Sequence, residues 1–183
     1  MLYYVIVAVG ALFGIFIIFE ISNYNKFQIL KIKISEAFNS MDILFEKKAN
    51  LLERAINIIK ENNKQYKENL LLDNLTKIKS KKLDRFELNH ELMLAFRDYK
   101  SILDLDKKIA SLDSLKAINE ELIVIDNDLN ASKKYYNDNI VLYNNLVKCL
   151  PSNLVALIFK YKKKEFFKEE KIETLEILKD EKK

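Results

Sequence analysis

Glycine and proline are almost missing from this 183-residue chain. It contains two glycines and one proline, and Gly10 and Gly14 both lie within the first fifteen residues. Sandwiches, barrels, doubly wound sheets and phosphate-binding loops need turn residues and glycines, so these classes are excluded from residue 15 onward. Apolar residues make up 49% of the chain, which excludes wholesale disorder. We therefore expect an all-α protein of ordinary domain size.

Cysteine is also scarce. The single Cys149 excludes an intramolecular disulfide framework and fits a reducing compartment. The residue stands at the apolar edge of a helical pattern, which predicts a small buried hydrophobic side chain. A reactive thiol remains the alternative, because Lys148 is adjacent.

The chain has a single histidine, His90. Glu87 and His90 form an E-x-x-H element, which helical di-iron sites use twice together with two further glutamates. No second histidine is present, although a symmetric dimer could supply one. We therefore expect no catalytic residue, no metal site and no cofactor. A metal-dependent enzyme of the helical-bundle type that uses Glu87 and His90 remains the alternative.

Arginine is rare, and the net charge of +4 is mild. A nucleic-acid-binding domain gathers arginines or stacking aromatic residues on one face. The three arginines Arg54, Arg85 and Arg97 are instead far apart in the sequence. We therefore expect no nucleic-acid partner.

A long apolar run opens the chain. Residues 1–19 carry no ionisable side chain apart from two tyrosines, and a helix of this length is about 28 Å long, close to the thickness of a bilayer core. The run lacks the basic start and small-residue cleavage site of a secretory signal. We predict an uncleaved transmembrane anchor over residues 1–20, with a cleaved signal or an interfacial helix as alternatives.

The flanks of this anchor differ in charge. Lys26, Lys31 and Lys33 follow it, whereas only the α-amino group precedes it. The positive-inside rule then places the N-terminus outside and residues 20–183 in the cytoplasm. Within the anchor, Gly10 and Gly14 form a G-x-x-x-G unit, which allows close approach of two membrane helices and predicts self-association.

Two long stripes of apolar residues at alternating steps of three and four predict two core-facing helices. The first comprises Phe27, Leu30, Ile34, Ala37, Met41, Leu44, Lys48, Leu51, Ala55 and Ile58. The second comprises Leu115, Ile118, Leu122, Ile125, Leu129, Ser132, Tyr136, Asn139, Tyr143, Leu146 and Leu150. Ser111 or Ser114 can cap the second helix, and Pro151 ends it.

A broken helical stretch lies between the stripes. It contains a short apolar repeat over residues 66–78, a connection at 80–82, and a capping box formed by Asp84 and Glu87. This order predicts an elongated antiparallel bundle of three legs that run up, down and up from the membrane. In that topology Pro151 lies about 50 Å from the bilayer. The charged residues 169–183 are expected to form a solvated tail.

Lys48 is the only polar member of the first stripe. Its stem can pack while its ammonium group reaches an acid such as Asp42 or Glu121. The alternative is a polar device that fixes the register of the helices at some cost in stability.

The segment after Pro151 combines apolar and basic residues. It can form a short closing helix, capped by Ser152, or an exposed docking patch for a protein or an anionic surface. Its expected distance from the bilayer favours a protein partner. The candidate patch comprises Leu154, Leu157, Ile158, Tyr161, Lys162, Lys163, Lys164, Phe166 and Phe167.

Several short motifs in this chain carry a resemblance to a known family. They are Tyr24-Asn25, Ala37-Phe38-Asn39-Ser40-Met41-Asp42, Lys47-Lys48, Glu120-Glu121-Leu122, Lys133-Lys134-Tyr135-Tyr136-Asn137-Asp138, Tyr143-Asn144, Leu150-Pro151-Ser152-Asn153-Leu154 and Glu165-Phe166-Phe167. Together these motifs resemble the LemA family of bacterial membrane-anchored helical proteins. Residues 60–105 align poorly, a proline usual in the family is missing near residues 52–56, and residues 161–164 are more basic than usual. The resemblance implies a single-pass protein with a long helical domain, here residues 21–168, and no established enzymatic activity.

These observations together predict a membrane-anchored helical interaction or scaffold protein at the inner face of the bacterial cell membrane. Its expected partners are the lipid bilayer through residues 1–20 and proteins that the sequence does not identify. Assembly of several copies is a further possibility that the G-x-x-x-G unit raises.

Overall fold

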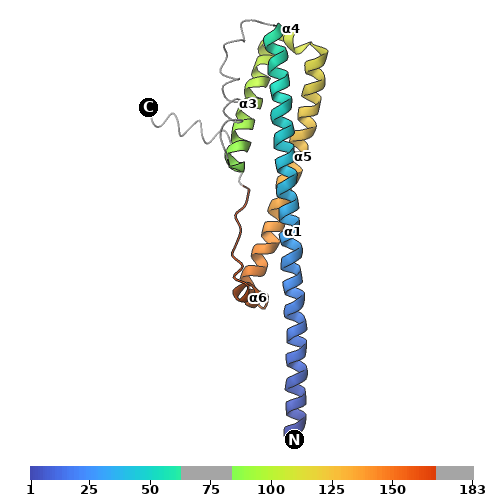
Figure 1. Ribbon diagram of the computed structural model, residues 1–183, viewed down its shortest axis with the longest axis vertical. Coiled ribbons are helices and arrows are strands. Elements are labelled where there is room, and N and C mark those ends of the chain that lie inside the picture. Colours follow the sequence, from blue (N-terminus) through green and yellow to red (C-terminus); the bar gives the residue numbers. More distant parts are fainter. Residues whose placement is uncertain (63–83, 168–183) are drawn as a thin grey trace, which may run out of the picture. The chain divides into compact units, whose positions relative to one another are not determined.

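The computed structural model describes residues 1–62 and 84–167, all of whose regular elements are helices (Figure 1). The elements are α1 (Leu2–Asn62), α3 (Arg85–Leu105), α4 (Lys107–Ala110), α5 (Asp113–Lys148) and α6 (Asn153–Ile158). The all-α prediction is confirmed. The predicted repeat over 66–78, the connection at 80–82 and the tail over 169–183 lie outside the described residues.

The contacts divide the chain into two compact units. Of the described residues, unit 1 comprises Met1–Phe38 and Lys134–Phe166, and unit 2 comprises 39–62, 84–133 and Phe167. Helices α1 and α5 contribute residues to both units. Each unit therefore contains one segment of α1 and one segment of α5.

In unit 1 the two long helices run antiparallel. The rings of Phe38 and Tyr136 lie 5.3 Å apart, and the rings of Phe27 and Tyr143 lie 5.4 Å apart. Rising numbers on α1 therefore pair with falling numbers on α5. Phe27 is fully buried in this contact, as the three-and-four spacing of the first stripe predicts.

The end of unit 1 returns to the early part of α1. The Phe159 ring lies 4.7 Å from the Tyr24 ring, and the Tyr161 ring lies 4.9 Å from the Phe27 ring. Helix α6 therefore packs beside α1 a few residues beyond the apolar segment (Figure 1). The prediction that Pro151 lies about 50 Å away from that segment is wrong.

The direction of α3 in unit 2 explains this error. The capping box of Asp84 and Glu87 starts α3 as predicted. Arg85, at the start of α3, pairs with Asp42 of α1. Farther along both helices, the Lys48 ammonium group lies over the Phe96 ring. Helix α3 thus runs parallel to this segment of α1, not antiparallel.

Helix α5 is the helix that runs antiparallel to α1 and α3. The short α4 separates α3 from α5, and Tyr99 of α3 lies beside Leu115 of α5, where its hydroxyl points to the Leu115 carbonyl at 3.5 Å. Ser111 ends α4, and Ser114 lies inside α5, so neither serine caps α5. The order of legs is therefore up for α1, up for α3 and down for α5.

In unit 2, α1 has buried residues on a second face besides the face that carries the first stripe. A second set of residues at steps of four and three is also buried, because both α3 and α5 pack on α1 in this unit. The set comprises Phe45, Ala49, Leu52, Ile56 and Ile59.

We predict that Leu122→Lys strongly destabilises the protein. The Leu122 side chain is fully buried in α5, so the change removes packed apolar area and buries an unpaired charge, at a cost of about 4 kcal/mol. Val124→Lys is the matched control, because Val124 is 58% exposed on the same helix and the change should shift stability by less than about 0.5 kcal/mol. Chemical unfolding of the full chain in detergent measures both. Equal losses for the two variants would show that the stripe is not core.

Candidate functional site

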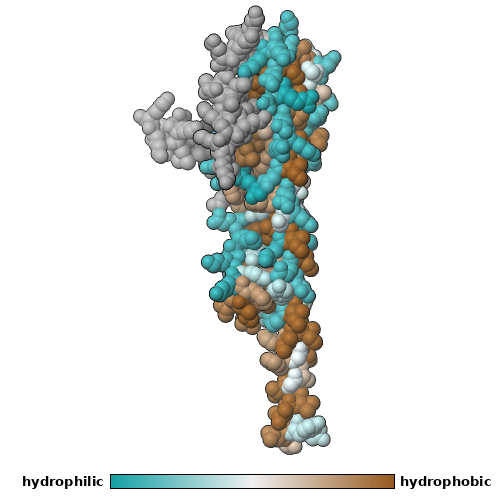
Figure 2. Space-filling view, viewed as in Figure 1, coloured by the Kyte–Doolittle hydropathy of each residue, from teal (hydrophilic) through white to brown (hydrophobic). Residues whose placement is uncertain are grey.

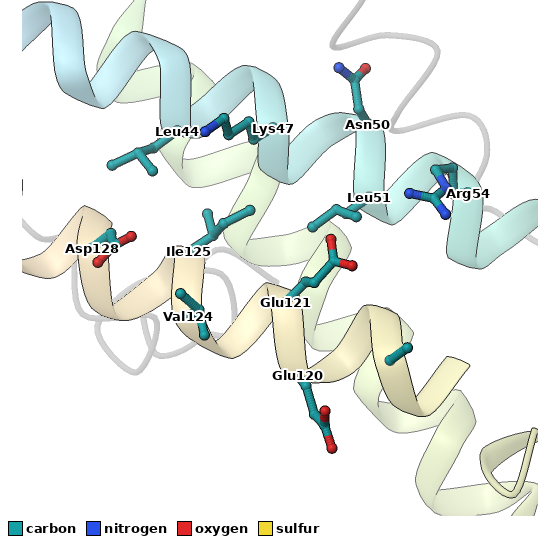
Figure 3. A pocket seen from close by; sticks show the side chains of 11 residues that line it. Leu44, Lys47, Asn50, Leu51, Arg54, Glu120, Glu121, Val124, Ile125 and Asp128 are labelled. Carbon is teal, nitrogen blue, oxygen red and sulfur yellow. The ribbon is translucent and has the colours of Figure 1, made fainter. Parts of the chain in front are cut away.

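A groove of about 730 Å³ lies between α1 and α5 in unit 2. Its apolar surface comes from Leu44 and Leu51 on α1 and from Val124 and Ile125 on α5 (Figure 3). Leu51 and Ile125 are nearly buried, whereas Val124 is exposed. The antiparallel register of the two helices brings residues 44–54 opposite residues 117–128 and so places these side chains in one groove. The result is an apolar strip that is exposed to solvent at Val124 and covered at Leu51 and Ile125.

Charged residues of opposite sign border this strip. Lys47 and Arg54 lie on the α1 side, one heptad apart, and Glu120, Glu121 and Asp128 lie on the α5 side. Figure 3 shows Glu121 pointing toward α1, whereas Glu120 points away from it. Within the described part of the chain, none of these five charged side chains forms an ion pair or hydrogen bond. Among the described residues, the groove therefore has a basic edge on α1 and an acidic edge on α5.

The shifted pKa values lie away from the groove. Burial raises the pKa of Tyr99 to about 12. Burial, followed by the charge of Tyr161, raises the pKa of Tyr143, and a hydrogen bond from Lys116 lowers the pKa of Asp113. None of these groups lines the groove. An apolar strip with two charged edges is typical of surfaces that an amphipathic helix covers.

Lys48 lies beside the groove but faces the interior of unit 2. Only 3% of its surface is exposed, and its ammonium group forms an ion pair with Asp126 of α5. The predicted partners, Asp42 and Glu121, are wrong, because Asp42 pairs with Arg85 and Glu121 faces the groove. The position is enclosed by α3 and α5, so the ammonium group cannot reach solvent and needs a carboxylate within the bundle.

The candidate chemical residues lie on two parts of the described chain, with Glu87 and His90 on α3 and Cys149 just beyond the end of α5. Glu87 accepts a hydrogen bond from the Asp84 backbone N–H at 3.0 Å, as part of the capping box of α3. His90, one turn farther on, is half-buried. Among the described residues, no group of three or more potential ligands could hold a metal ion. Cys149 is exposed, because α5 ends at Lys148, and the prediction that it is buried is wrong.

The structure separates the residues of the predicted docking patch into exposed and packed groups. Leu157 and Ile158 are 77% and 72% exposed, and Lys162, Lys163 and Lys164 are also exposed. Leu154 and Phe166 are partly exposed.

Two members of the patch are packed against the protein. The Tyr161 hydroxyl accepts a hydrogen bond from the Gln28 amide at 2.8 Å. Phe167 is 2% exposed and stacks on Phe86 at 4.8 Å in unit 2. Phe167 therefore does not belong to an exposed surface.

The apolar start of α1 is exposed over its whole length. By length and composition, α1 could cross a membrane through this segment. A methyl group added at Gly10 or Gly14 would meet no atom within 4 Å. Self-association through the two glycines stays a prediction.

A comparison with known families places this chain beside relatives of one kind of helical protein. The family model described as the LemA family matches residues 37–177, which include both sides of the groove and helix α6. No curated protein matches the chain. The match covers more than half of the sequence.

We predict that the two members of the Lys48–Asp126 pair respond unequally to neutral substitution. Asp126→Asn leaves a buried ammonium group without its carboxylate and should cost about 2–3 kcal/mol, less than for a fully enclosed pair because Asp126 is 28% exposed. Lys48→Met removes the charge, keeps the length of the stem and should change stability by less than about 1 kcal/mol.

Chemical unfolding of the full chain in detergent measures both variants. Asp104→Asn is the control, because the pair between Lys107 and Asp104 is exposed and its loss should cost less than about 0.5 kcal/mol. A larger loss for Lys48→Met than for Asp126→Asn would contradict the prediction.

Proposed function

Because the chain belongs to the LemA family and α1 opens with a segment that could cross a membrane, we propose that it is a single-pass membrane-anchored interaction protein. It has no catalytic activity of its own in this proposal. It acts at the inner face of the bacterial cell membrane, where its helices bind other proteins.

The continuity of α1 is the observation that carries the proposal. Residues 2–19 expose apolar side chains, and the same helix then buries Phe27 and Leu30 against the C-terminal part of unit 1. Figure 2 shows this change as a brown column that gives way to mixed teal and brown surface. An exposed apolar helix of this length is unfavourable in water and favourable in a bilayer. A lipid environment for residues 2–19 removes the conflict.

The lysines after the apolar segment support an inward orientation. Lys26, Lys31 and Lys33 are exposed on α1 and lie within the distance from the membrane at which basic residues determine topology. In this proposal the N-terminus lies outside the cell and residues 20–183 lie in the cytoplasm.

The groove of unit 2 supports binding of an amphipathic helix from a protein partner. Two antiparallel helices with an apolar strip between them offer the place that a further helix occupies in a bundle. The basic edge at Lys47 and Arg54 suits acidic residues of that helix, and the acidic edge at Glu121 and Asp128 suits basic residues. Such a partner covers the strip and pairs both edges at once.

The orientation is tested with protease added to intact spheroplasts. We expect residues 20–183 to remain undigested, because the membrane shields them, and to be digested after detergent is added. The measurement is immunoblotting of a C-terminal tag, with an outer-facing membrane protein as the control for protease activity. Loss of the tag from intact spheroplasts would reverse the proposed orientation.

The groove is tested with a photo-crosslinking residue at Val124 in native membranes. We expect adducts at Val124, which lines the groove, and none at Ile43, an equally exposed α1 residue that does not line it. The double variant Lys47→Glu, Arg54→Glu reverses the basic edge and should reduce the adduct at least about tenfold.

The variant Lys33→Glu is the matched control for this charge reversal, because Lys33 is exposed on α1 and lies outside the groove. It should leave the adduct unchanged. Equal adducts at Val124 and Ile43, or an adduct insensitive to the double variant, would remove the groove from the proposal.

A further inference from the structure

Apolar and basic side chains gather on one short part of unit 1, which we name the α6 surface. Leu157, Ile158 and Phe159 are 77%, 72% and 50% exposed. The lysines at positions 160 and 162–164 follow them directly and are also exposed. In Figure 2 the region of α6 is brown and lies beside the upper, C-terminal end of the apolar column of α1. This combination is typical of surfaces that bind at the headgroup level of a membrane.

The position of the α6 surface along α1 follows from its aromatic contacts. Phe159 packs on Tyr24, with 4.7 Å between the ring centres. Tyr24 is five residues beyond Phe19, the last residue of the apolar run, which corresponds to about 7.5 Å along a helix. The polar layer on each side of a bilayer core is about 5–7 Å thick. If the apolar run fills the core, Phe159 therefore lies at the outer border of the headgroups.

The backbone holds the α6 surface in a defined shape. Lys160 adopts a positive φ of 54°, which ends α6, and the Tyr161 N–H donates to the Ala156 carbonyl at 2.8 Å. Beyond this turn, the Asn144 side chain of α5 makes two hydrogen bonds to the Lys164 backbone, at 2.8 and 2.9 Å. The lysines are thus carried by an ordered backbone segment, not by a free end.

The charge around the α6 surface is almost entirely positive. Residues 148–165 contain five lysines and one glutamate. The facing segment of α1, residues 20–33, adds three lysines and one glutamate. Lysines near a membrane surface are attracted to anionic lipids, whereas two such surfaces brought together would repel each other. The charge therefore favours an anionic lipid layer over a second copy of the chain.

We propose that the α6 surface is a second membrane contact, which inserts its apolar side chains among the anionic headgroups of the leaflet from which α1 emerges. The proposal rests on the proposed membrane anchor. It adds a contact that holds the C-terminal part of unit 1 against the bilayer beside α1. It also replaces the protein partner that the sequence alone favoured for this segment.

The test uses the full chain with Cys149→Ser, so that one introduced cysteine carries an environment-sensitive fluorophore. Three positions are labelled, namely Leu157→Cys in the α6 surface, Ile15→Cys in the apolar segment and Leu105→Cys at the end of α3. Ile15 and Leu105 are 65% and 81% exposed. The protein is reconstituted into phosphatidylcholine vesicles that contain phosphatidylglycerol as the minor component. Quenching by spin-labelled lipids reports contact with the bilayer.

We expect quenching at Leu157 at least about twice that at Leu105. This quenching should fall in vesicles of phosphatidylcholine alone and in the triple variant Lys162→Gln, Lys163→Gln, Lys164→Gln, because both changes remove the attraction between lysines and anionic lipid. Circular dichroism of each labelled protein shows whether it remains helical.

The label at Ile15 distinguishes the two proposals. Strong quenching at Ile15 with no excess at Leu157 over Leu105 would overturn the second membrane contact and leave the anchor intact. No quenching at Ile15 would overturn the anchor, and the second contact with it. A bismaleimide crosslink between two copies at Leu157→Cys, without quenching, would assign the α6 surface to self-association and overturn the lipid contact.

Discussion

The unbroken backbone of α1 is the constraint on which unit 1 depends. No glycine or proline occurs between residues 15 and 62, so the hydrogen-bonded helix continues from the apolar segment into the segment that packs on α5. Tyr24 and Phe27 stand on this helix and hold Phe159 and Tyr161. Whatever surrounds the apolar segment therefore also determines the surroundings of α6.

Spacing in the sequence predicted which face of each long helix is buried, but it could not supply the direction of the legs. The residues of the second long stripe from Leu115 to Tyr143 are largely buried, whereas Leu150 is exposed beyond the end of α5. A three-and-four repeat is the same for parallel and antiparallel neighbours. The second buried set on α1, from Phe45 to Ile59, forms its own three-and-four repeat in the sequence beside the first stripe. Two such repeats on one helix indicate that it packs against two neighbouring helices.

Local signals were more reliable than distant pairings. The capping box at Asp84 and Glu87 depends on residues three apart, and the structure forms it. The partner of Lys48 depends on the register between α1 and α5, which no local pattern contains, and Asp126 was therefore missed. The groove also depends on the register between α1 and α5, so the sequence did not predict it. Its charged residues were visible in the sequence, but their arrangement on two facing edges requires the antiparallel register.

The groove and the α6 surface differ in the chemistry they offer. The groove sets basic Lys47 and Arg54 opposite acidic Glu121 and Asp128, a pattern that only a ligand with both signs of charge in a fixed order can match. The α6 surface has charge of one sign, which any anionic layer satisfies without a fixed pattern. If both proposals hold, unit 2 provides the specificity for a protein partner, whereas the contact proposed for unit 1 requires only a membrane of suitable charge.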